Sequence, residues 1–249
     1  MYLEPQQSSL AEAVPRLGDN TGGYLRIDTA QELSTSMVDS LNGLCDRVED
    51  GSGDSVVVLY LHDATDNLDR AWPGKVGIHT VNRWERALRR VERLDAVTIA
   101  VAEGHCGGPA LEVLLATDYR IGTPDLRLDP PHASGEFWPG MGMHRLAQQV
   151  GIARARRLVH FPTELSGDLA MQFGLVDELA ADVVEAVGCA ADVAIRASGP
   201  ERGIRRLLLL ETTTTSYEEA LGIHLAACDR ALRRADAARN HSTPQPEGA

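Results

Sequence analysis

The chain has 249 residues, with 24 lysines and arginines against 36 aspartates and glutamates, so its formal net charge is −12. A nucleic-acid binder is expected to have a stripe of basic residues and aromatic rings for base stacking. This chain is acidic and only 4% of its residues are aromatic, which argues against such a role. The same charge disfavours contact with an anionic membrane surface, whereas the 43% hydrophobic content is that of an ordinary folded protein.

The first 20 residues are polar, contain two prolines and lack the basic-then-apolar order of a signal peptide. We interpret residues 1–20 as a flexible arm of a cytoplasmic protein. No apolar run approaches the roughly 20 residues that a membrane span needs. The cysteines stand at no disulfide-framework or metal-ligand spacing, which predicts buried, reduced thiols. They are Cys45, Cys106, Cys189 and Cys228.

The first half of the chain alternates between runs typical of buried strands and runs typical of amphipathic helices. The clearest strand, 55–61 (SVVVLYL), is continuously apolar and rich in β-branched residues, as expected of a strand covered on both faces. In chain order the predicted elements are a strand at 24–27, a helix at about 29–49, the strand at 55–61, a polar loop at 62–77, a helix at 79–93 and a strand at 97–102. Buried strands separated by helices predict an α/β fold.

A glycine turn leads into an apolar helix within residues 104–118 (GHCGGPALEVLLATD), and a short strand is predicted at 119–121. Glu112 is the single carboxylate of that helix. The proline-rich stretch 123–140 predicts a long loop or a broken strand, and long loops on a compact scaffold tend to carry function.

Helices dominate the rest of the chain, with a short strand predicted after Gly174. The helices are expected at 143–150, 153–160, 166–173, 183–197, 202–210 and 218–238. We therefore divide the protein into an arm at 1–20, an α/β core at 21–180, a helical region at 181–238 and a disordered tail at 239–249.

Four segments carry a family resemblance because of their order and spacing. They are VTIAVAEGHCGGPALEVLLATDYRI, FWPGMGMHRL, VGIARARRLV and GDLAMQFGLVDEL. In this order they resemble the active-site strand, turn and helix, the Pro-Gly loop, and the later helices and Gly-Leu-Val strand of the crotonase superfamily, the enoyl-CoA hydratase/isomerase family. The resemblance implies a spiral of short β-strands and α-helices with a helical C-terminal region. It also implies an acyl-CoA thioester as substrate, with no cofactor beyond its CoA moiety.

A narrower resemblance rests on a shortened first half together with NRWERALRR and GGPALEVLLATDYRI. These features resemble the dehydratase-like crotonases of dihydroxyphenylglycine biosynthesis in peptide-antibiotic pathways. The resemblance implies elimination of water from a polyketide-like CoA precursor through an enolate. Hydration and double-bond isomerisation stay open as alternatives.

The family resemblance also implies that two backbone N–H groups hold the thioester carbonyl oxygen. The first donor position of the family falls on Pro109, which has no N–H. Proline is favoured at the first helical position, so we expect the N–H of Gly108 or Ala110, next to Gly107, to give a shifted or weakened oxyanion hole. The family's second donor lies in an Ala-Gly-x-Asp segment, which residues 62–69 lack.

Glu112 matches the family's first catalytic carboxylate, and its apolar neighbours predict a raised pKa, useful for proton transfer. A solvated helix charge is the alternative. Where the hydratases carry a second glutamate, ungapped counting gives His132, which would assist as an acid or base near neutral pH. A polar surface loop is the ordinary place for such a histidine. A register shift of one residue keeps Glu136 as a rival.

Other side chains near these motifs have both a functional and a structural interpretation. Trp138 is expected to wall the acyl pocket, or simply to be buried as a large ring. His105 borders the glycine turn, where packing is the more usual role. The polar loop contains three aspartates, Asp63, Asp66 and Asp69, and by number alone they could bind a metal ion. Such residues are more typical of a solvated acidic loop, so we expect no metal.

Arginines recur on the predicted helix at 79–93. They are Arg83, Arg86, Arg89 and Arg90. Such a run binds the phosphates of CoA, pairs with an acidic neighbour or forms a solvated face, and we favour the solvated face.

Two alternatives to the lyase or isomerase remain. Because Pro109 and the missing donor segment weaken the oxyanion hole, a crotonase-fold partner that enhances a polyketide synthase with little catalysis of its own is possible. A thioester hydrolase or decarboxylase on the same fold is the other. The family resemblance further implies a homotrimer or hexamer, with the helices after residue 180 as candidates for the contact.

Overall fold

The computed structural model of the protein describes residues 21–51, 55–63, 72–133, 135–198 and 201–242. The chain divides into two compact units, Met1–Gly203 and Ile204–Ala249. The predicted arm at 1–20 lies outside the described residues, and so does the end of the predicted tail. Among the described residues, no helix is long and apolar enough to cross a membrane.

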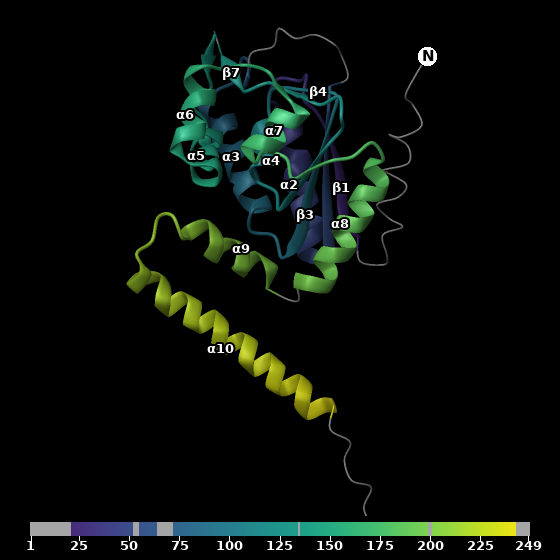
Figure 1. Cartoon of the computed structure of the whole chain (residues 1–249), viewed down its shortest axis with the longest axis vertical. Helices are drawn as coiled ribbons and strands as arrows, with labels where there is room; N and C mark the ends of the chain where they lie inside the picture. Colours follow the sequence, from purple (N-terminus) through teal and green to yellow (C-terminus); the bar gives the residue numbers. More distant parts are fainter. Residues whose placement is uncertain (1–20, 52–54, 64–71, 134, 199–200, 243–249) are drawn as a thin grey trace, which may run out of the picture. The chain divides into compact units, whose positions relative to one another are not determined.

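A five-stranded parallel sheet lies in the first unit (Figure 1). In spatial order its strands are β1 (Thr21–Asp28), β2 (Ser55–His62), β3 (Ala96–Glu103), β5 (Tyr119–Gly122) and β10 (Glu178–Leu179). At the carboxyl ends of the first three strands, Asp28 pairs with His62 and His62 with Glu103. The residues that follow these ends, including the glycine turn, therefore start from one edge of the sheet.

Helices cover both faces of this sheet, which explains why β2 is apolar throughout. The odd-numbered residues from Val57 to Leu61 belong to the core that α2 (Thr35–Asp50) and α3 (Ile78–Val91) help to form. The even-numbered residues from Val56 to Tyr60 pack in a second core with α8 (Val183–Ser198). Successive side chains of a strand point to opposite faces, so two covered faces require an unbroken apolar run.

The helix predicted to start at about residue 29 starts later. The Ser34 hydroxyl accepts the Met37 N–H at 3.2 Å and caps α2, which begins at Thr35. The preceding residues instead turn at the sheet edge, where the Thr29 N–H donates to the His62 carbonyl oxygen at 2.8 Å.

Short elements fill the middle of the chain. The glycine turn follows β4 (His105–Cys106) and leads into the short helix α4 (Ala110–Leu114). The proline-rich stretch holds short strands, consistent with the predicted broken strand. These are β6 (Arg127–Leu128), which pairs with β4 and with β9 (Leu165–Ser166), and the antiparallel pair β7 (His132–Ala133) and β8 (Glu136–Phe137).

The remaining helices match the predicted ones within a few residues. They are α5 (Met141–Val150), α6 (Ile152–His160), α7 (Gly167–Phe173), α9 (Arg202–Glu211) and α10 (Tyr217–Ser242). The division after Gly203 differs from the boundary predicted at residue 180. The reason is that α8 packs against β3 and β5, so this helix belongs with the sheet.

The cysteines are all free, but they are not all buried. Cys45 and Cys106 lie in the core, whereas Cys189 and Cys228 are exposed, so the prediction of buried thiols is wrong for these two. Cys189 lies on α8, whose buried positions include Val187 and Ala191 and not the cysteine. Spacing alone does not show which face of a helix a lone cysteine occupies.

Candidate active site

Backbone hydrogen bonds hold the glycine turn and the start of α4. The Ala110 N–H donates to the Gly107 carbonyl oxygen at 2.9 Å, and the Pro109 carbonyl accepts the Val113 N–H at 3.0 Å. Pro109 has a helical φ of −75° directly before the helix, close to the predicted role of proline at a helix start. The Ala110 N–H is therefore engaged inside the turn, which corrects the prediction that it is free to hold a substrate oxygen.

Gly108 supplies the donor that this turn still offers. Its φ is +47°, in the left-handed region, and a Cβ there would lie 2.8 Å from the Thr29 carbonyl oxygen. Only glycine fits such a position. The Gly108 N–H has no acceptor within the described residues. The segment searched for the second donor, 62–69, lies outside the described residues except for His62 and Asp63.

Glu112 lies in α4 with only 1% of its surface exposed, so the interpretation as a solvated helix charge is wrong. One carboxylate oxygen, Oε2, accepts the indole N–H of Trp84 at 2.8 Å and that of Trp72 at 3.2 Å. The two rings meet edge to face with centroids 5.8 Å apart. Two rigid donors from different parts of the chain thus fix the orientation of this carboxyl group.

The other carboxylate oxygen, Oε1, is buried without a hydrogen-bond partner among the described residues. It faces the start of α5, where a Cβ on Gly140 would lie 2.8 Å from Oε1, and one on Gly142 would lie 2.8 Å from the Glu112 Cγ. Glycines at both positions let the backbone approach the carboxyl group. Leaving a buried oxygen unpaired costs free energy, so it calls for an explanation, such as binding or catalysis.

Charged groups beneath Glu112 form a buried cluster that joins α3 to α5. Arg145, 6% exposed, donates to Glu92 at 2.6 Å and to Glu85 at 2.9 Å. Burial and the charge of Glu85 raise the pKa of Glu112 to about 7, against the opposing effects of Trp84, Arg145 and Trp72. The carboxyl group therefore populates both protonation states near neutral pH, as proton transfer in either direction requires.

Replacing Glu112 with glutamine should stabilise the folded protein at alkaline pH. The pKa rises from an ordinary 4.5 to about 7 on folding, so the contribution of Glu112 to wild-type stability is fully present below 4.5 and is lost as the pH rises through 7. Above that range the free energy of unfolding of the glutamine variant should exceed that of wild type by about 3 kcal/mol. At acidic pH the difference should be small. Urea unfolding across the pH range measures this. Wild-type and variant curves that run parallel would contradict it.

His132, in β7, is half-buried, and its Nδ1 lies 3.2 Å from the Pro130 carbonyl oxygen. Its own carbonyl accepts the backbone N–H of Trp72 at 2.9 Å, so Trp72 connects this histidine to Glu112. The rival Glu136 is exposed on β8. The backbone of His132 is thus linked through Trp72 to Glu112, its imidazole contacts the Pro130 carbonyl, and Glu136 lies at the surface.

Trp138 is half-buried and borders the space that Oε1 of Glu112 faces. A Cβ on Gly140 would lie 2.5 Å from the Trp138 Nε1 and 2.8 Å from that Oε1, so both atoms approach the same point. The ring also packs against the main core. The role of this ring as a wall of an acyl pocket stays a prediction.

His105 is held between two carboxylates. Its Nδ1 lies 3.3 Å from Asp63 and its Nε2 lies 2.8 Å from Asp129. Both ring nitrogens are therefore engaged, which agrees with the packed role that we considered more usual. The ring also borders the turn, since a Cβ on Gly107 would lie 4.0 Å from its Cε1.

A possible metal-ligand set lies beside the same histidine. The ligand atoms of His105, Asp129 and Glu164 lie within 4.8 Å of one another. However, Glu164 already pairs with the Arg127 guanidinium at 2.6 Å, which competes with a cation. Two members of the predicted acidic loop, Asp66 and Asp69, lie outside the described residues.

The arginines of α3 meet acidic neighbours rather than solvent alone. The ion pairs are Arg83 with Asp39 at 2.5 Å, Arg89 with Glu92 at 2.9 Å, and Arg90 with Asp46 at 2.5 Å and Glu49 at 2.6 Å. Arg86 is exposed. The acidic partners confirm one of the open alternatives, and two of the four arginines, Arg83 and Arg90, pair with acidic residues of α2.

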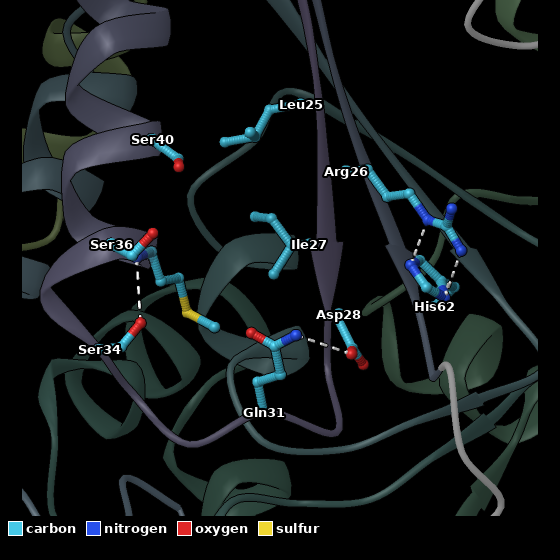
Figure 2. Close-up of a pocket in the computed structure, with 10 residues that line it drawn as sticks. Leu25, Arg26, Ile27, Asp28, Gln31, Ser34, Ser36, Ser40 and His62 are labelled. Atoms are coloured by element: carbon cyan, nitrogen blue, oxygen red, sulfur yellow. Dashed lines mark hydrogen bonds between the residues drawn. The ribbon is translucent and has the colours of Figure 1, made fainter.

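A pocket of about 410 Å³ lies along β1 and the start of α2. Figure 2 shows Arg26 and His62 on one side of β1, with Ile27 on the side of α2. Arg26 donates to the His62 ring and forms no ion pair with a carboxylate among the described residues. Thr29 lies between this pocket and the glycine turn. Its N–H donates to the carbonyl oxygen of His62, which lines the pocket, and its own carbonyl oxygen lies against Gly108.

The residues that orient Glu112 were not predicted from the sequence. The sequence predicts a helix around Trp84 but no role for this residue, nor for Trp72, Glu85 and Arg145. One signal was available, since a buried tryptophan needs a partner for its N–H. A lone carboxylate in an apolar helix is a plausible one.

The sheet, the glycine turn and the buried glutamate define an α/β protein of the crotonase type. Residues 78–198 match the family model described as enoyl-CoA hydratase/isomerase. A curated protein of Amycolatopsis orientalis, named enoyl-CoA-hydratase, is 44% identical over 210 residues, which are 84% of this chain and 95% of that protein. The chain therefore belongs to the enoyl-CoA hydratase/isomerase family.

Solved structures share the fold at low sequence identity. An enoyl-CoA hydratase from Shewanella pealeana superposes with a TM-score of 0.72 at 14% identity, covering 93% of this chain and 98% of that chain. An enoyl-CoA hydratase/isomerase from Marinobacter aquaeolei gives 0.70 at 17% identity, covering 84% and 87%. These likenesses confirm the predicted crotonase-type α/β fold.

Proposed function

We propose that the protein is an enzyme of the enoyl-CoA hydratase type, which acts on an acyl-CoA thioester through an enolate. The observation that carries the proposal is the Glu112 carboxyl group, which is buried, held by two indoles, unpartnered at Oε1 and shifted to a pKa of about 7. The printed name of the Amycolatopsis relative supports the same reaction type.

In the direction of water elimination, Oε1 of Glu112 removes a proton from the α-carbon, the carbon bonded to the thioester carbonyl. Negative charge then develops on the carbonyl oxygen, and fixed N–H dipoles in a dry site stabilise it best. The Gly108 N–H beside Gly107 is our candidate for one such donor. His132 is our candidate for the second acid, which protonates the departing hydroxyl group. Collapse of the enolate then forms the double bond and releases water.

The substrate that we favour is a polyketide-like acyl-CoA that loses water on the way to dihydroxyphenylglycine. The support is the resemblance of the NRWERALRR and GGPALEVLLATDYRI segments to dehydratase-like crotonases. No cofactor beyond the CoA moiety is needed for this chemistry. Arg26, which donates to an imidazole instead of a carboxylate, is a candidate for the CoA phosphates, and Trp138 is a candidate for the acyl wall.

We further propose that the protein works in the cytoplasm as a homotrimer or hexamer, as the family resemblance implies. The helices after residue 180 are the candidates for the contact between copies. Light scattering of the purified protein measures this state directly.

A second function is favoured by one specific observation. Pro109, at the family's donor position, has no N–H, and the Ala110 N–H is engaged with Gly107, so the turn can offer a donor only from the shifted position of Gly108. A protein with a weakened hole would bind an acyl-CoA without turning it over. In this alternative it assists a polyketide synthase by binding the product of that enzyme.

Mass spectrometry of products separates these functions. Purified protein is incubated with 2-enoyl-CoA and 3-hydroxyacyl-CoA thioesters, and the gain or loss of one water supports the proposal. Release of free CoA or of carbon dioxide would assign a hydrolase or a decarboxylase instead. Binding of a thioester without any product would overturn the enzymatic proposal in favour of the partner.

A further inference from the structure

The indole N–H groups of two tryptophans converge on one oxygen of Glu112. Trp84 comes from α3, and Trp72 comes from the chain directly before Pro73. Both rings are buried, with 1% and 2% of their surfaces exposed. An indole donates through a single N–H and accepts nothing, so each ring has this carboxylate oxygen as its polar partner. Such an arrangement treats the two oxygens of Glu112 unequally.

This inequality decides where a proton can reside. Oε2 already accepts two N–H groups, and a hydrogen on it would compete with both donors. Oε1 accepts none, although it is buried and faces the approach of Gly140. The protonated form of Glu112 therefore carries its hydrogen on Oε1, and the ionised form keeps its two hydrogen bonds on Oε2.

We propose that Trp72 and Trp84 are positioning residues that anchor Oε2 of Glu112 and confine proton exchange to Oε1. The catalytic meaning of this inference rests on the proposed function, because Oε1 is the atom that would meet the substrate. The indoles act through the carboxyl group and touch no reacting atom. They also prevent rotation of the carboxyl group, which would otherwise exchange the two oxygens.

The indoles also affect how strongly Glu112 binds a proton. Glu85 on α3 and Arg145 on α5 are the charged groups that act on Glu112, with opposite signs. Burial favours the neutral carboxyl group, whereas the two N–H donors favour the anion. Removing one donor should therefore strengthen proton binding to Glu112. A hydrogen bond to a charged group is strong enough for about a tenfold change in proton affinity.

The experiment is a pH titration of the substrate-free protein labelled with ¹⁵N-tryptophan. The indole signals of Trp72 and Trp84, assigned through their phenylalanine variants, should shift with one common midpoint, and the shift should vanish in Glu112→Gln. Indole signals that do not shift over the pH range in which Glu112 titrates would overturn the inference. The titration itself uses wild type and Glu112→Gln, and the tryptophan variants serve only to assign the signals.

Infrared titration of the Glu112 carboxyl group, identified by difference from Glu112→Gln, gives the second measurement. Trp84→Phe and Trp72→Phe should each raise the midpoint, by about tenfold in proton affinity. The matched control is Tyr119→Phe, which removes an aromatic donor from a different carboxylate, Glu178, at 3.1 Å. It should leave the Glu112 midpoint unchanged. Unchanged midpoints in both tryptophan variants would mean that the rings only pack.

Neither titration involves a thioester, so this inference and the proposed function can fail separately. Titrating indoles in a protein that turns over no thioester would remove the proposed function and keep the anchoring role. Conversely, turnover that depends on Glu112 while the indole signals stay fixed would keep the function and remove the anchors.

Discussion

Replacing Glu112 with glutamine should lower the turnover of an acyl-CoA thioester by about 10²–10⁴-fold, the usual contribution of a positioned acid or base. Glutamine has nearly the size of glutamate, and its side-chain oxygen still accepts the indole N–H groups of Trp72 and Trp84. Its amide neither takes nor gives a proton near neutral pH. The loss should therefore appear in kcat, measured by steady-state kinetics on the substrate identified from its products.

The control for this result is Glu136→Gln, which removes the rival carboxylate on the exposed strand β8. We expect it to retain turnover close to wild type, because its side chain lies at the surface. Loss of fold does not explain a dead Glu112 variant, since that variant should be at least as stable as wild type above pH 7. Full turnover in Glu112→Gln would remove the assigned proton transfer.

The elements of the sheet could be predicted from the sequence because their patterns are local. The run at 55–61 is apolar on both alternating faces, and the structure covers both faces of β2 with helices. Glu112 could be singled out for the same reason, since a carboxylate in an apolar helix is conspicuous. Pro109 also behaves as its fixed φ predicts.

The surroundings of Glu112 could not be predicted, because they come from distant parts of the chain. Trp72 and Trp84 precede it by 40 and 28 residues, and nothing in the local spacing shows that both N–H groups reach one oxygen. The Ala110 N–H is another case. Whether it faces a ligand or closes the turn depends on the backbone angles at Gly108, which glycine leaves free.

The contacts of α8 could not be predicted from the sequence either. The periodicity of α8 predicts a helix, and it is one, but the pattern does not state whether its apolar face meets the sheet or the helices that follow. Val183 and Val187 pack with the even-numbered residues of β2. Tertiary contact therefore decides the boundary, and the sequence marks only the ends of the helix.

Replacing Arg145 with methionine should cost about 3–5 kcal/mol of folding free energy, the typical result of removing one partner from a buried ion pair. Arg145 is 6% exposed and pairs with both Glu85 and Glu92, so its loss would remove this ion pair from Glu85 and leave Glu92 with Arg89. Methionine preserves the volume of the stem, so the deficit reports charge and not a cavity. Urea unfolding of wild type and variant at neutral pH measures it.

The matched control for the Arg145 variant is Arg83→Met. Arg83 lies at the surface of α3, the helix that carries Glu85. The ion pair of Arg83 with Asp39 has side chains 48% and 58% exposed, so its loss should cost no more than about 1 kcal/mol. Equal destabilisation of the two variants would show that the Arg145 cluster is not held by charge.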